Sequence, residues 1–197
     1  MASTGNIHSI DYIIGRAVLA RATANKLGLV HDLIISPSKG DLVGLSLRLP
    51  DESLRLVDHR DIYSFGQDAV MINSEESAAT VKDSPLKALP LAKNNLIGAN
   101  IVTESGKLLG QIANVYTRLA ETLLFIYEVR SSILDKLLGH ALFFLASQGR
   151  AMSGDFARIV VAEDTSEQAD NSLAALEARL FGPSREDPVV TVRSRGY

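Results

Sequence analysis

The chain of 197 residues contains neither cysteine nor tryptophan, and only 6% of its residues are aromatic. Without cysteine it forms no disulfide and no cysteine-ligated zinc site. Long apolar runs are missing as well: the richest stretch, 133–146, is interrupted by Asp135, Lys136 and His140, so no segment is expected to span a membrane. The first residues lack the basic and apolar regions of a secretory signal. We therefore expect a cytoplasmic protein.

Motifs of catalysis and nucleotide binding are also missing. The sequence holds no GxSxG, no GxGxxG and no GxxxxGK[ST] pattern. The four histidines have no metal-ligand spacing: they are His8, His31, His59 and His140. An acid–base role for His31-Asp32 or for the loop 58–61 is the alternative to a polar strand position and a charged loop; we favour the latter. The sequence predicts no enzyme activity, no cofactor and no metal.

Charge of one sign does not dominate either. The chain has 20 Lys and Arg against 23 Asp and Glu, a formal net charge of −3, which disfavours a broad electrostatic grip on nucleic acid. Basic residues are dispersed, with a small group in the last residues that includes Arg193 and Arg195. This tail is either a solvated terminus or a contact to RNA or an anionic membrane surface.

An internal repeat is what the sequence does have. Its members, about 82 residues apart, are Ile14-Gly15 and Ile97-Gly98, Leu27-Gly28 and Leu109-Gly110, Val30 and Ile112, and Asp32 and Asn114. Short alternating apolar segments separated by turn residues follow each start, as in 42–49 and 123–129. Two small antiparallel β-barrels in tandem are predicted, each too small to be more than marginally stable alone. We expect each barrel to be stabilised by contact with the other barrel or with a partner, which includes a second copy of the chain.

The predicted domain boundaries follow from this repeat. Residues 1–8 are expected to be a polar leader, and a helical turn within 131–138 is expected to precede the fifth strand of the second barrel. The divisions are a first barrel at 9–73, a linker at 74–93, a second barrel at 94–162, a C-terminal helix at 163–182 and a flexible tail at 183–197. An edge strand at 188–192 is the alternative for part of the tail.

The C-terminal helix is predicted from its start, its stop and its apolar stripe. Asp164 or Thr165 caps it and Gly182-Pro183 ends it. The stripe lies either on its own barrel or on a partner. The candidate partner contacts are Leu173, Leu176, Leu180, Phe181, Arg193 and Arg195.

The repeat, together with the segment Tyr63-Ser64-Phe65-Gly66 and the apolar residues 69–72, resembles the PRC-barrel family. That family includes the cytoplasmic domain of the photosynthetic reaction-centre H subunit and a domain of a ribosome maturation factor. The resemblance covers residues 11–73 and, more loosely, 94–162, where the segment 148–151 departs from the pattern. It implies a tandem PRC-barrel protein.

The function implied by the resemblance is docking rather than catalysis. We expect an adaptor or assembly factor that joins a larger protein complex, with the cytoplasmic side of a photosynthetic membrane as the location that the resemblance implies. The alternative is an RNA- or ribosome-associated maturation role, which the acidic composition does not favour. Fold analogy alone does not decide between them.

Overall fold

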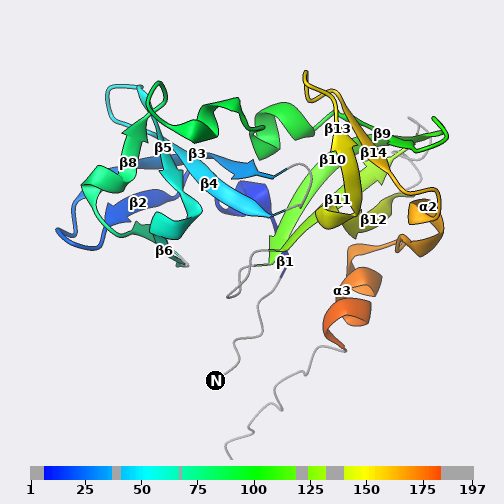
Figure 1. The fold of residues 1–197 in the computed structure, drawn as a ribbon. Coiled ribbons are helices and arrows are strands. Elements are labelled where there is room, and N and C mark those ends of the chain that lie inside the picture. The colour runs from blue at the N-terminus through cyan, green and yellow to red at the C-terminus, as the bar shows by residue number, and fades with distance from the viewer. Residues whose placement is uncertain (1–6, 37–40, 67, 119–123, 132–139, 183–197) are drawn as a thin grey trace, which may run out of the picture.

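The computed structural model describes residues 7–36, 41–66, 68–118, 124–131 and 140–182. It is mainly β, with two sheets that lie side by side and short helical segments between and beside them (Figure 1). The predicted fold class is therefore confirmed. Within the described part of the chain, no helix is long and apolar enough to cross a membrane.

The first sheet has seven strands in the order β6-β7-β2-β3-β4-β5-β8. The strands are β2 (Ala17–Ala20), β3 (Lys26–Ile35), β4 (Leu42–Arg48), β5 (Leu54–Asp58), β6 (Ile62–Phe65), β7 (Ala69–Ile72) and β8 (Ala78–Thr80). Three short helical segments belong to this half: η2 (His59–Asp61), η3 (Glu75–Ser77) and η4 (Pro85–Ala88).

The second sheet runs β12-β11-β10-β9-β14-β13, and β1 also pairs with β10. Its strands are β1 (Ile7–Ser9), β9 (Asn100–Thr103), β10 (Leu108–Arg118), β11 (Leu124–Arg130), β12 (Leu142–Leu145), β13 (Gly149–Met152) and β14 (Arg158–Val161). The remaining helical segments are η1 (Ile10–Tyr12), η5 (Ala92–Leu96), η6 (Ala146–Gln148), α2 (Thr165–Gln168) and α3 (Leu173–Phe181).

The two sheets repeat one strand plan. Strands β6, β7, β2, β3, β4 and β5 correspond in order to β13, β14, β9, β10, β11 and β12. Each sheet contains one parallel pair, β2 with β7 and β9 with β14, in place of the wholly antiparallel pairing expected. Of the segment 148–151, which departs from the family pattern, residues 149–151 still belong to β13, which pairs with β14.

Gly28 and Gly110 explain why glycine recurs at the start of β3 and β10. A Cβ on Gly28 would lie 2.1 Å from the carbonyl oxygen of Arg48, and one on Gly110 would lie 2.4 Å from that of Arg130. The neighbouring strand therefore passes too close for any side chain. This shared packing identifies β3 and β10 as equivalent strands.

The segment that precedes each repeat pairs with a strand of the other repeat. We call these two segments, 7–13 and 91–96, the crossing segments. Strand β1, which precedes the first repeat, pairs antiparallel with β10, with Ser9 opposite Tyr116. The segment in front of the second repeat pairs with β3 through Ile34 and Leu91. Two predictions are corrected: the leader 1–8 includes the start of β1, and the linker 74–93 includes β8, which extends the first sheet beside β5.

Asp32 holds the second of these crossing segments. The carboxylate is fully buried and accepts hydrogen bonds from the backbone N–H groups of Leu33 (2.8 Å), Lys93 (3.0 Å) and Asn94 (3.0 Å). Burial raises the pKa of Asp32, and these hydrogen bonds oppose the rise. Its counterpart Asn114 accepts from the N–H of Val115 (2.8 Å) and the hydroxyl of Ser9 (3.2 Å).

One apolar core joins the two repeats. It includes inward-facing residues of both sheets and, from the crossing segments, Ile10, Ile13, Ala92 and Leu96, all without exposed surface. Neither sheet therefore encloses its core alone. This shared core agrees with the expectation that two marginally stable units stabilise each other.

The predicted C-terminal helix is two helices. Asp170, between α2 and α3, exchanges backbone hydrogen bonds with Phe143 of β12 (2.8 and 2.9 Å). This bridge takes the place of β8 in the first repeat and breaks the helix. Ser172 then caps α3 by accepting from the N–H of Ala175. Of the predicted turn at 131–138 and the tail at 183–197, all but Ser131 lie outside the described residues.

Candidate functional site

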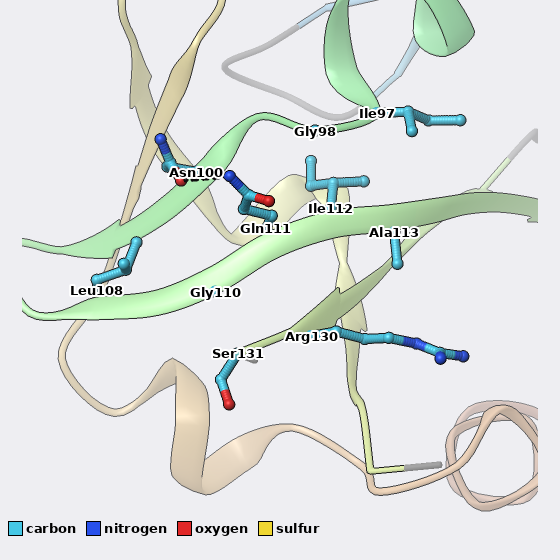
Figure 2. A pocket seen from close by; sticks show the side chains of 10 residues that line it. All are labelled: Ile97, Gly98, Asn100, Leu108, Gly110, Gln111, Ile112, Ala113, Arg130 and Ser131. Atoms are coloured by element: carbon cyan, nitrogen blue, oxygen red, sulfur yellow. Dashed lines mark hydrogen bonds between the residues drawn. The ribbon is translucent and has the colours of Figure 1, made fainter. Parts of the chain in front are cut away.

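A groove of about 470 Å³ lies on the second repeat, over β9 and β10 and beside the end of β11 (Figure 2). At Gly98 and Gly110 the backbone itself lines the groove, since glycine has no side chain. The side chains around it include Ile97, Asn100, Leu108, Gln111, Ala113 and Arg130. Most of these side chains are uncharged.

The first repeat has a histidine at the position of Ala113. His31 and Ala113 are the extra residues at equivalent bulges, between Val30 and Asp32 and between Ile112 and Asn114. Nη2 of Arg48 donates to Nδ1 of His31 (2.9 Å) on the surface of the first sheet, where Leu29 is 42% exposed. Ala113 has only a methyl group, and the corresponding space in the second repeat stays open.

Arg130, the counterpart of Arg48, is held by a neighbour on its own strand. Its Nε and Nη2 lie 2.6 and 2.5 Å from Oε1 of Glu128. Glu128 is buried and also accepts from the hydroxyl of Tyr116 (2.8 Å). Burial and then this hydrogen bond raise the pKa of Tyr116, which keeps its proton at neutral pH. Figure 2 shows Arg130 extending away from Gln111 and past Ala113.

The two ends of the groove are apolar and face solvent. Leu108 is 58% exposed and Ile97 is 37% exposed, and they lie toward opposite ends in Figure 2. Lys26 occupies the position of Leu108 in the first repeat. The second repeat thus exposes an apolar side chain where the first repeat has a charged one.

Between these ends the groove is polar. Nε2 of Gln111 donates to Oδ1 of Asn100 (3.2 Å), and Arg158 is in register with Asn100 on the adjacent strand. The equivalent row of the first repeat has Leu29 and Ala17 for the two amides and Ala69 for Arg158. The site thus combines apolar ends, a pair of amides and a cation, an arrangement suited to recognition.

The predicted contact residues on α3 lie mainly against their own sheet. Leu176 is fully buried with Ile126 and Phe143, and Leu173 and Leu180 pack against the same cluster. The alternative that the helix covers its own repeat is therefore what the structure shows, and Leu176 is not available to a partner. Phe181 is 39% exposed beneath the guanidinium of Arg118. Arg193 and Arg195 lie outside the described residues.

The histidines are not brought together. His8 stacks on Tyr12, His31 contacts Arg48, and Nδ1 of His59 lies 3.2 Å from Oδ1 of Asp58. His140 is exposed. Within the described ranges, no three His, Cys, Asp or Glu side chains are arranged to hold a metal ion.

Sequence reasoning missed the groove, although the aligned repeats carried a signal for it. The signal is the exchange of His31 for Ala113 and of Lys26 for Leu108 at positions that the surrounding glycines align. That Ala113 stands at a bulge equivalent to that of His31 and lines the groove is visible only in the structure.

The comparisons with known proteins agree with this architecture. Residues 6–78 match the family model of the PRC-barrel domain. A search of curated proteins found no match. A PRC-barrel domain points in general to a role in protein interaction or assembly. Residues 6–78 therefore form a PRC-barrel domain.

Proposed function

We propose that this protein is a non-catalytic adaptor or assembly factor that docks onto a partner protein through the groove of its second repeat. The observation that carries the proposal is the groove with exposed Leu108 and Ile97 at its ends, which has Ala113 at the bulge where the first repeat has His31 bonded to Arg48. Apolar side chains that face solvent around a hollow are typical of interaction sites.

The comparison of the two repeats also suggests a separate role for each of them. The first repeat matches the family model and serves as the scaffold, while the second supplies the docking groove. The resemblance to the reaction-centre domain makes a membrane-bound photosynthetic assembly one partner to test. An RNA partner finds less support, because the chain has a net charge of −3.

Filling the groove tests the proposal. Ala113→His places in the second repeat the side chain that the first repeat carries at the equivalent bulge, so the backbone is expected to accept it. Tagged wild-type chain and this variant are used as baits in native lysate. Ala22→His, at an exposed turn of the first repeat, is the matched control.

A protein retained by the wild-type chain and by Ala22→His, and lost with Ala113→His, supports docking at the groove. Equal retention by all three baits contradicts it, as does retention of no protein by the wild-type chain. Thermal unfolding of the three baits, followed by circular dichroism, checks that each one is folded.

A further inference from the structure

We infer that the groove receives an extended acidic segment of the partner, with an apolar side chain at one end and a carboxylate near Arg158. This inference rests on the proposed function, since it specifies the chemistry of the partner at the same groove. Three features of the groove support it: its length along β10, its unused amide groups and its charge.

The length of the groove fits a few residues of extended chain. Leu108 and Ile112 both line it and belong to one strand. At about 3.3 Å per residue, the distance from one to the other is roughly 13 Å. An extended segment of about four residues covers that distance, and its alternate side chains point to the same side. An apolar side chain of such a segment fits against Leu108 or Ile97.

The amides in the middle of the groove fit a peptide backbone. Asn100 and Gln111 use one oxygen and one nitrogen on each other. In the described part of the chain, Nδ2 of Asn100 and Oε1 of Gln111 have no hydrogen-bond partner. The groove therefore offers one donor and one acceptor side by side. Each residue of a peptide presents the complementary N–H and C=O groups.

The charge around the groove favours a carboxylate. Arg158 is exposed and makes no ion pair among the described residues, and neither does exposed Lys107, which precedes Leu108. Glu128, the nearest acid on β11, is already paired with Arg130. Two acids also interact with these cations. Hydrogen bonds from the hydroxyl of Ser153 and the backbone N–H of Ala157 lower the pKa of Asp155, with a smaller contribution from Arg158. The backbone N–H of Ser105 is the main cause that lowers the pKa of Glu163, with a smaller contribution from Lys107.

Arg158 and Lys107 are thus two exposed cations beside the groove, on a chain with a net charge of −3. One or two cations select a single carboxylate, whereas strong binding of RNA needs many phosphate contacts. A peptide with one or two acidic residues therefore fits the groove better than a polyanion does.

Two short synthetic peptides test the inference. In one, leucine alternates with glutamate; in the other, leucine alternates with lysine. Binding of each labelled peptide to the full chain is measured by fluorescence anisotropy, and the site is located from amide NMR shifts of Gly98 and Gln111. The acidic peptide is expected to bind at the groove and the basic peptide to bind at least tenfold more weakly.

Charge reversal gives the matched control. Arg158→Glu is expected to weaken the acidic peptide about tenfold, while Lys26→Glu, an identical change in charge at the equivalent rim of the first repeat, leaves its affinity unchanged. Equal binding of both peptides, or no effect of Arg158→Glu, overturns the inference. So does a single-stranded RNA oligonucleotide or a phosphatidylserine vesicle that shifts the Gly98 and Gln111 amides while the acidic peptide does not.

Failure here is distinguishable from failure of the proposed function. If a partner protein is lost with Ala113→His yet the acidic peptide does not bind, docking stands and only the partner chemistry is wrong. If Ala113→His changes no retention, the groove is not the docking site.

Discussion

The carboxylate of Asp32 accepts the backbone N–H of Lys93 at 3.0 Å, across 61 residues of sequence. Through this contact the first repeat holds the segment that introduces the second. The side chain of Lys93 returns to Asp11, 2.6 Å away, in the segment that introduces the first repeat. The two crossing segments are thus joined to each other as well as to the sheets, although an exposed ion pair of this kind adds little stability.

Asp32→Ala is expected to lower the free energy of unfolding by about 2–3 kcal/mol, because three backbone N–H groups lose their acceptor. Urea unfolding of the full chain measures the loss. Asn114→Ala, at the equivalent position, removes one local acceptor and one hydroxyl contact. A loss of about 1 kcal/mol is expected there. Equal losses for the two variants would show that Asp32 has no special part in joining the repeats.

Asp58 makes stability depend on acid pH. The side-chain hydrogen bond from Arg60 is the main reason that the pKa of Asp58 falls to about 2. Its contribution to stability is complete above the pKa of the unfolded chain, near 4, and is lost as the pH falls toward 2. Asp58→Asn is expected to flatten the stability profile in this interval. Unfolding at a series of pH values tests this, and unchanged slopes would contradict it.

Tyr127→Phe is expected to leave stability unchanged or raise it by up to about 1 kcal/mol. The hydroxyl of Tyr127 is buried and has no hydrogen-bond partner in the described part of the chain. Its ring packs edge-on against Phe144, with 6.0 Å between ring centres, and phenylalanine preserves that contact. Thermal and urea unfolding measure the effect. A clear loss of stability would mean that the hydroxyl has a partner in solution, such as a buried water.

Gly28→Ala and Gly110→Ala are expected to destabilise the fold by about 1–3 kcal/mol or more, because the added methyl group meets the carbonyl of the neighbouring strand. Gly154→Ala is the control, since a Cβ there meets nothing within 4 Å. Unfolding free energies of the three variants are compared. A neutral Gly28→Ala would show that β3 and β4 separate more easily than their close contact indicates.

Local sequence patterns predicted most strands but not the exchange between the repeats. The alternation in 42–49 and the glycines at 28 and 110 depend on neighbouring residues, and they yielded β4, β3 and β10. The pairing of Ile7 with Arg118 depends on residues more than a hundred positions apart. No local signal marks such a pair, so the leader was predicted to be irregular. Likewise, the bridge from Asp170 to Phe143 divides a segment whose own sequence favours one helix.

The candidate site depended even more on three-dimensional context. Leu176 has the helical spacing of a contact residue, and the same spacing directs it onto Ile126 and Phe143 of its own sheet. The groove is lined by a small residue at a bulge, Ala113, and by Arg130, which is paired with Glu128. Neither effect follows from hydrophobic periodicity, because both depend on which side chains share one face of a curved sheet.

The central claim is that a partner protein occupies the groove of the second repeat. Hydrogen–deuterium exchange of the full chain, with and without the protein retained by the wild-type bait, tests it most directly. The partner is expected to slow exchange within 97–113 and to leave 26–31, the equivalent strand of the first repeat, unchanged. Slower exchange at 26–31 or along α3, with 97–113 unaffected, would contradict it.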